Sequence, residues 1–173
     1  MDLIVTADAD GAGRARFGAN AWPCALGPAG IRALKREGDG ATPVGSFAPR
    51  RVLYRADRVA APKTDLPVAA LAPEDGWCDD PADPAYNRQV RLPYPARHER
   101  LWRDDGIYDV IVILGHNDAP PVPGRGSAIF LHVAQPDYAP TQGCIALARA
   151  DLLAFLAAVD DSTQVCVREG ESI

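Results

Sequence analysis

The chain has 173 residues, a net charge of −5, 47% hydrophobic residues and 7% aromatic residues. This length and composition are typical of one globular domain with a hydrophobic core, so we expect residues 1–173 to form a single domain. A chain with this negative net charge lacks the positive field that nucleic-acid binding requires. No apolar run approaches the roughly 18 residues of a membrane span. We therefore expect neither a nucleic-acid partner nor a membrane span, and the sequence leaves the oligomeric state open.

The first half of the chain is predicted to form short strands and loops. Leu3–Ala7 and Arg14–Phe17 flank Asp10–Gly13, which has the composition of a hairpin turn. A strand is expected over Ser46–Arg55. Residues 56–86 are rich in Pro, Ala and Asp, and we expect a loop there with room for one short strand.

The second half is predicted to contain two buried strands and a helix. Arg97–Arg103 is expected to form one or two helical turns. Asp109–Leu114 and Ala128–Val133 are apolar runs of the length of buried strands. Ala148–Val159 has the apolar spacing of an amphipathic helix, and a strand is expected over Thr163–Val167. The predicted fold class is therefore mainly β with a few short helices (α+β).

Charge is unevenly distributed before the predicted Asp109–Leu114 strand. Residues 73–84 carry five acidic residues and no base, whereas residues 85–105 carry five arginines. The two stretches could form a polar binding face for the carboxylates and amine of a substrate. The alternative is that they are two solvated loops.

Few residues in the chain can carry out covalent chemistry. The three histidines are His98, His116 and His132, and the four cysteines are Cys24, Cys78, Cys144 and Cys166. The cysteines have no C-x-x-C spacing, and a chain of this length does not need disulfides, so we expect free thiols. A metal site formed by His116, His132 and Cys144 would lack the usual ligand spacing. We therefore expect no metal and no cofactor.

The segment Ser127–Leu147 contains the strongest candidate for a reactive site. His132 ends the predicted strand, and Cys144 follows twelve residues later, after a loop that can return the thiol to the imidazole. A protonated histidine lowers the pKa of a neighbouring thiol and makes it a nucleophile. Gly143 allows close approach to backbone N–H groups that can form an oxyanion hole, and a helix expected soon after Cys144 would favour the thiolate. The alternative is that both residues only pack in the core.

This segment is similar to that of the YkuD-type L,D-transpeptidases, cysteine acyltransferases that act on peptidoglycan. The family carries a His at the end of a strand and, after a loop, the sequence Ser/Thr-His-Gly-Cys. The matching residues are His132, Thr141, Gly143 and Cys144. Lys35–Phe47 also resembles the family's Thr-Pro-x-Gly-x-Phe turn, and Gly124–Ser127 resembles the approach to the His strand.

The resemblance, which covers roughly residues 3–168, implies a fold like the β-sandwich or barrel of these catalytic domains. It also implies that Cys144 attacks the carbonyl of the third residue of a stem tetrapeptide, typically diaminopimelate. D-Ala leaves with a proton from His132, and an acyl-enzyme remains. The backbone carbonyl of Val133 is implied as the group that orients His132, and the backbone of Gly143 as part of the oxyanion hole.

The chain departs from the family pattern at two positions beside the nucleophile. Gln142 stands where many members have His, and Ala146 stands where an Arg often holds a substrate carboxylate. We expect Arg125 to replace that Arg, with Arg88 as the other candidate. The remaining expected substrate-binding residues are Thr141, Gln142, Tyr86 and His116.

Three functions follow from the resemblance. An L,D-carboxypeptidase would transfer the acyl group to water and trim tetrapeptides during murein recycling. We favour this function because no basic, apolar secretory leader is apparent in the sequence, which indicates a cytoplasmic protein. The alternative is a periplasmic L,D-transpeptidase that forms 3-3 cross-links or attaches amines, its leader having been removed. The third is a non-catalytic murein-binding module. Both enzymes are expected to be acylated by carbapenems.

Overall fold

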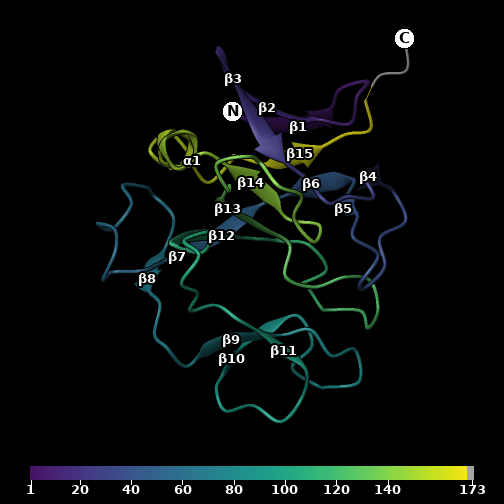
Figure 1. Cartoon of the computed structure of the whole chain (residues 1–173), viewed down its shortest axis with the longest axis vertical. Coiled ribbons are helices and arrows are strands. Elements are labelled where there is room, and N and C mark those ends of the chain that lie inside the picture. Colours follow the sequence, from purple (N-terminus) through teal and green to yellow (C-terminus); the bar gives the residue numbers. More distant parts are fainter. Residues whose placement is uncertain (171–173) are drawn as a thin grey trace.

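The computed structural model describes residues 1–170, which form a mainly β fold with one α-helix. Figure 1 shows a large sheet that curls into a half-barrel and a smaller sheet that lies apart from it. The ten-stranded sheet has the order β6-β15-β1-β2-β3-β14-β13-β12-β7-β8. The small sheet has the order β10-β9-β11, and β4 pairs with β5. The predicted mainly-β class is confirmed.

The ten-stranded sheet contains, in chain order, β1 (Leu3–Ala7), β2 (Gly13–Phe17), β3 (Asn20–Ala25), β6 (Gly45–Phe47), β7 (Pro49–Tyr54), β8 (Val68–Ala70), β12 (Val110–Leu114), β13 (Phe130–Val133), β14 (Ile145–Leu147) and β15 (Val165–Val167). The remaining strands are β4 (Ile31–Arg32), β5 (Thr42–Pro43), β9 (Asp75–Cys78), β10 (Arg88–Arg91) and β11 (His98–Arg100). The helix is α1 (Arg149–Leu156).

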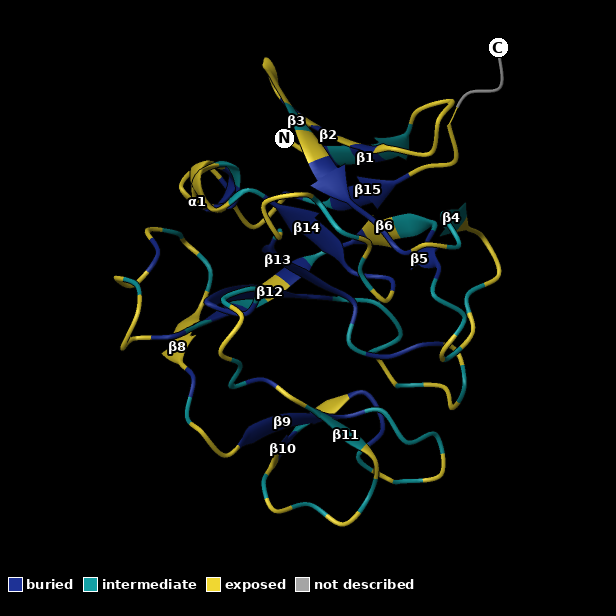
Figure 2. Ribbon diagram, in the orientation of Figure 1, coloured by how far each residue is buried: buried dark blue, intermediate teal, exposed yellow. Residues whose placement is uncertain are grey.

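Strand β12 is buried on both faces, which explains its uninterrupted apolar sequence. Val112 packs in a core with residues of α1, which we call the helix-side core. Ile111 and Ile113 pack in a second core with Trp77 of β9, which we call the pocket-side core. Successive side chains of a strand point to opposite faces, so one run of five apolar residues supplies both cores. Figure 2 shows the burial through the middle of the large sheet and the exposure of β8 at its edge.

The helix α1 covers one face of the large sheet. Leu152, Phe155 and Leu156 are buried in the helix-side core. The ring of Phe155 meets that of Phe17 edge-on, with the centroids 5.2 Å apart. This contact joins α1 to the strand β2, which is far from it in sequence. The apolar stripe predicted for this segment is the face that packs, although the helix ends three residues before Val159.

The structure differs from the predicted elements in several places. Residues 97–103 form no helical turn, because His98–Arg100 is strand β11 and pairs with β9. The segment 56–86 holds two strands, β8 and β9, instead of one. The strands β3 and β14 were missed. Strand β14 has three residues, which is too short for a period-2 pattern to be recognised, and it lies between Cys144 and α1.

Replacing the aromatic ring that joins α1 to the sheet should destabilise the protein strongly. We expect Phe155→Ala to lower the free energy of unfolding by about 3–5 kcal/mol, because it leaves a cavity in a fully buried site. Urea unfolding followed by circular dichroism measures this. The control is Leu153→Ala in the same helix, whose side chain is 36% exposed and which should change stability by less than about 1 kcal/mol. Equal effects would contradict the assignment of the packing face.

Candidate active site

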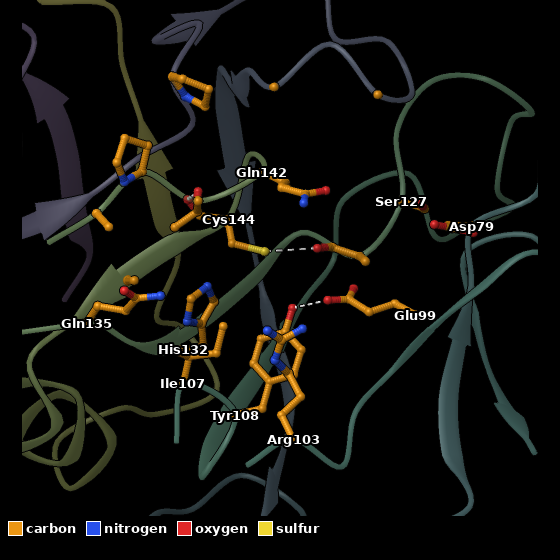
Figure 3. A pocket seen from close by; sticks show the side chains of 18 of the residues that line it. Asp79, Glu99, Arg103, Ile107, Tyr108, Ser127, His132, Gln135, Gln142 and Cys144 are labelled. Atoms are coloured by element: carbon orange, nitrogen blue, oxygen red, sulfur yellow. Dashed lines mark hydrogen bonds between the residues drawn. The ribbon is translucent and has the colours of Figure 1, made fainter. Parts of the chain in front are cut away.

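A hollow of about 410 Å³ lies between the large sheet and the small sheet. Figure 3 shows its side chains, with Cys144 and His132 on one side and residues from β11 and the loop after it on the other. Its lining includes both predicted catalytic residues and a set of charged and polar groups. The lining residues used below are Lys35, Glu37, Asp79, Glu99, Arg103, Tyr108, His132, Thr141, Gln142, Cys144 and Ala146.

His132 and Cys144 are placed by the parallel pairing of β13 with β14. Leu131 lies opposite Ile145, and His132 lies opposite Ala146. Leu131 and Ile145 both point into the helix-side core. Because side chains alternate along a strand, the neighbouring residues point to the other face. His132, Ala146 and Cys144 therefore line one hollow, although twelve residues separate the histidine from the cysteine.

The imidazole of His132 is held in one orientation. Its Nδ1 lies 3.0 Å from the backbone oxygen of Val133, the group that the resemblance implies. A carbonyl accepts only, so Nδ1 carries the proton and donates, which leaves Nε2 as the acceptor of the neutral ring. The ring of Tyr108 meets that of His132 edge-on at 5.2 Å. The expected contact with Val133 is present, and its catalytic role stays a prediction.

The thiol of Cys144 is directed at the backbone and makes no hydrogen bond with His132 within residues 1–170. Its Sγ donates to the carbonyl oxygen of Ala128 at 3.1 Å and accepts from the backbone N–H of Phe130 at 3.4 Å. Figure 3 shows the sulfur of Cys144 pointing away from the imidazole of His132. The hydrogen bond from the thiol to Ala128 must break before the thiol proton can pass to His132.

Burial keeps both predicted catalytic groups neutral. Loss of solvation raises the pKa of the Cys144 thiol to about 12, and the carboxylate of Glu99 adds to this rise. The same effect lowers the pKa of His132 to about 4, against the opposing hydrogen bond to Val133. A charged form is disfavoured wherever water is excluded. The pKa of Cys144 is raised, contrary to the expected lowering by His132, and strand β14 lies between Cys144 and α1.

The residues just before Cys144 form a tight turn. The hydroxyl of Thr141 donates to the carbonyl of Cys144 at 2.7 Å and accepts from the N–H of Gly143 at 3.1 Å. Gly143 has a φ of +122°, and a Cβ there would lie 2.6 Å from the carbonyl oxygen of Ala41. Ala41 precedes the Thr-Pro turn of β5, so that motif packs behind the nucleophile. The N–H of Gly143 donates to Thr141, and its expected place in an oxyanion hole stays a prediction.

Gln142 and Ala146 both line the hollow. Figure 3 shows the amide of Gln142 at the side of Cys144 away from Tyr108. The methyl group of Ala146 lies opposite His132 in the strand register. The position at which the family often has an Arg is therefore inside the site, but it supplies no charge.

The two arginines expected to hold a substrate carboxylate do not line this hollow. Arg88 lies on β10 beside a separate hollow that it shares with Arg50 and Arg51. The backbone oxygen of Arg125 lies 3.1 Å from Nε2 of His116, and the residue is largely exposed. Strand register and loop path decide where these side chains lie, and their expected role in binding substrate stays a prediction.

Tyr86 and His116 support a loop and do not line the hollow. The hydroxyl of Tyr86 donates to Glu37 at 2.5 Å and accepts from the N–H of Gly126 at 3.0 Å. The ring of His116 packs edge-on against Phe47. These contacts fix the segment that leads to the His132 strand. The expectation that both residues bind substrate stays a prediction.

The arginine of the hollow is Arg103, which the sequence reasoning did not single out. Its guanidinium lies over the ring of Tyr108, 5.4 Å from the centroid. The hydroxyl of Tyr108 donates to Glu99 at 2.5 Å. Arg103 belongs to the arginine-rich stretch 85–105, and that cluster is the sequence signal that could have pointed to it. Other members of that stretch pair with the acidic stretch itself, as Arg97 does with Asp79 at 3.0 Å.

Among residues 1–170, no cluster of three His, Cys, Asp or Glu side chains has the arrangement of a metal site. In the same range, no helix has the length and apolar character needed to cross a membrane.

The alkylation rate of Cys144 should report its raised pKa. With a thiol pKa of about 12, we expect the rate with iodoacetamide to rise about tenfold per pH unit between pH 6 and 10, since only the thiolate reacts. Mass spectrometry of the Cys144 peptide measures this rate, and the Cys166 peptide serves as the internal control. A plateau between pH 5 and 7 would indicate an ion pair and contradict the neutral resting state.

Adding a methyl group at position 143 should destabilise the turn before the nucleophile. We expect Gly143→Ala to lower the free energy of unfolding by more than about 1 kcal/mol, because positive φ is strained and the methyl group meets Ala41. Gly124→Ala is the matched control, since Gly124 has a φ of +80° and open space around it. Thermal melting of both variants separates steric overlap from backbone strain. Equal losses would show that the contact with Ala41 is unimportant.

A family model and a solved structure match the chain. Residues 11–167 match the family described as the YkuD L,D-transpeptidase catalytic domain. No curated protein matches the chain. Among solved structures, L,D-transpeptidase 1 of Mycobacterium tuberculosis is similar at 15% identity and a TM-score of 0.40, and the match covers 98% of this chain and 62% of that one. The chain therefore spans less than two thirds of that structure. Because the family match covers most of its length, the chain belongs to the family of YkuD L,D-transpeptidase catalytic domains.

Proposed function

We propose that the chain is a cysteine enzyme that cleaves the bond between the third residue and D-Ala of a peptidoglycan stem tetrapeptide. The observation that carries this proposal is the placement of Cys144 and His132 in one hollow, with Nδ1 of His132 engaged by Val133. That hydrogen bond leaves Nε2 free to accept the proton of the thiol. Membership of the family supports the class of reaction.

The proposed reaction begins from a neutral thiol and a neutral imidazole. The thiol proton moves from Cys144 to Nε2 of His132 as the sulfur attacks the carbonyl carbon, so that no stable ion pair has to form first. The oxyanion that forms needs hydrogen-bond donors. We assign the N–H of Cys144 to this role, since that of Gly143 donates to Thr141. His132 then returns the proton to the nitrogen of D-Ala, the C–N bond breaks, and an acyl-enzyme remains.

Water is the acceptor that we favour. His132 would take a proton from water, the hydroxide would attack the thioester, and the thiol would leave with a tripeptide as product. One hollow surrounds Cys144 and His132, and the two other hollows described contain neither residue. An acceptor peptide would have to share that hollow with the donor, whereas water needs little room. Trimming of soluble muropeptides in the cytoplasm is the setting we propose, and periplasmic cross-linking is the alternative.

Product analysis with a tetrapeptide muropeptide tests the proposal. With and without an amine acceptor, we expect the same tripeptide and free D-Ala, measured by liquid chromatography and mass spectrometry. Cys144→Ala should abolish turnover, and His132→Gln should reduce kcat by about 10²–10⁴-fold, the usual contribution of general acid–base catalysis. Cys166→Ala, which removes another buried thiol, is the matched control and should retain activity.

The other functions give different results in the same experiment. Cross-linked dimers or amine adducts would support transfer instead of hydrolysis. Intact mass after incubation with a carbapenem provides an independent readout, since acylation of Cys144 adds the mass of the drug. No product and no adduct would indicate a non-catalytic binding module, and an adduct on Cys144→Ala would contradict the choice of nucleophile.

A further inference from the structure

A second hollow, of about 610 Å³, contains none of the residues that line the active-site hollow. Its walls come from β7 and the end of β12 in the large sheet, and from β9 and β10 in the small sheet (Figure 1). Asn87 belongs to the wall between the two hollows. Its Oδ1 accepts from Nε1 of Trp77, which lines the second hollow, and from the N–H of Ala128, which lines the first, each at 3.0 Å. The proposed chemistry therefore leaves the second hollow unassigned.

Four arginines and one acid line this second hollow, which we call the arginine hollow. Arg50 and Arg51 come from β7, Arg88 and Arg91 come from β10, and the acid is Asp118. The chain as a whole has a net charge of −5, so this local excess of positive charge is opposite in sign to the rest of the molecule. Clefts lined by one sign of charge attract ligands of the other sign.

Arg51 is held in place without being neutralised. Its Nη2 donates to the side-chain oxygen of Gln89 at 2.7 Å, and Nε2 of Gln89 donates to the buried carboxylate of Asp75 at 3.0 Å. Within residues 1–170, no carboxylate lies within ion-pair distance of Arg51. Two successive hydrogen bonds therefore fix a half-buried guanidinium that keeps its charge.

The other three arginines differ in how far they are neutralised. Arg88 is exposed, and in the described part of the chain its side chain has no hydrogen bond and no ion pair. Arg91 lies 3.6 Å from Asp75, which is longer than a hydrogen bond. Arg50 forms an ion pair with Asp118, with 2.9 Å between nitrogen and oxygen. The charges of Arg51 and Arg88 are thus left without an acid.

The active-site hollow shows the opposite pattern. Lys35 forms an ion pair with Asp39, and Arg103 forms one with Asp105. Each of these cations is neutralised by its own neighbour in the chain. The unneutralised charge therefore distinguishes the arginine hollow from the active site, and we expect a small anion to favour the arginine hollow.

The floor of the arginine hollow leaves recognition to the arginines. Val90, Ile113 and Leu114 are apolar, and the indole N–H of Trp77 already donates to Asn87. The side-chain N–H groups of Asn87 donate to two backbone carbonyl oxygens. A guanidinium presents its N–H groups in a planar fork that fits the oxygens of a phosphate or a carboxylate. A ligand of this hollow must therefore supply several anionic oxygen atoms.

We propose that the arginine hollow binds the diphosphate group of a small ligand, with Arg51 and Arg88 neutralising its two phosphates. These two arginines come from different sheets, and two linked phosphates supply negative charge at two separate centres. A volume of about 610 Å³ lies in the range of small-molecule sites. The free diphosphate ion and a nucleoside diphosphate share this chemistry. The inference does not depend on the proposed function, because the two hollows share no residue.

Isothermal titration of the full chain with four anions tests the inference. We expect pyrophosphate to bind one-to-one and about tenfold more tightly than inorganic phosphate, because a second phosphate adds charge-assisted hydrogen bonds. Citrate should bind more weakly than pyrophosphate at the same ionic strength, because each carboxylate offers two oxygens instead of three. ADP distinguishes the source of the diphosphate: tighter binding than pyrophosphate indicates a nucleotide ligand, and equal or weaker binding indicates the free ion. Equal affinities for pyrophosphate, phosphate and citrate, or no binding, would overturn the inference.

Single substitutions locate the site. Arg88→Gln and Arg51→Gln should each weaken pyrophosphate binding by about 10- to 100-fold, the usual effect of losing a hydrogen bond to a charged group. Because Arg88 is exposed, its replacement should leave folding intact, and thermal melting of both variants checks this. Arg100→Gln, which replaces an exposed arginine on β11 of the same sheet, is the matched control and should retain the affinity of wild type. Unchanged binding in Arg88→Gln would contradict the inference.

Arg103→Gln tests whether the anion binds at the active site instead. This variant removes an arginine from the active-site hollow and should leave the affinity for pyrophosphate unchanged. A loss of affinity in Arg103→Gln, with Arg88→Gln unaffected, would place the anion at the active site and overturn the inference. Cys144→Ala should bind pyrophosphate as wild type does, so the result is independent of the proposed reaction.

Discussion

Parallel hydrogen bonding between β13 and β14 brings together two residues that lie twelve positions apart in the chain. Leu131 and Ile145 are paired and buried in the helix-side core, and this burial fixes the register of the two strands. A slip of one residue would turn every side chain of the strand to the opposite face. The positions of His132 and Cys144 therefore depend on apolar neighbours that have no part in the chemistry.

The same burial sets the electrostatic state of the site. A thiol with a pKa of about 12 and an imidazole with a pKa of about 4 do not form a stable ion pair, because the thiol keeps its proton. The backbone holds each group instead, with Ala128 accepting from the thiol and Val133 accepting from the ring. In this structure both groups are therefore neutral. Under the proposed mechanism, proton transfer to His132 accompanies the attack of the sulfur on the substrate carbonyl.

The small sheet gives the hollow its second wall and much of its charge. Strand β9 contributes Trp77 to the pocket-side core, where its ring meets that of Phe130 edge-on. This packing holds β11 and Glu99 opposite the nucleophile. Charged side chains on that wall are fixed by neighbours, as Arg103 is by Asp105. A wall of this kind loses little side-chain entropy when a ligand binds, which favours selectivity.

The sequence by itself determined the mainly-β class, the buried strands over β12 and β13, and the candidate pair His132 and Cys144. These predictions depend on local signals: an apolar run, a strand-end histidine, and a glycine before a cysteine. The helix after β14 was also found, because its apolar stripe has the period of a helix. Strand β14 was missed because three residues carry no measurable period.

Only the tertiary structure decided which charged residues face the nucleophile. Arg88 and Arg103 belong to the same arginine-rich stretch, yet Arg88 lies beside a separate hollow and Arg103 lies in the site. Strand register and loop path separate the two arginines, and the local composition of the sequence predicts neither the register nor the path. The protonation state of the cysteine likewise depends on burial by segments distant in sequence. Solvent exclusion is a property of the folded molecule, so a sequence motif can name the reactive groups but cannot assign their charges.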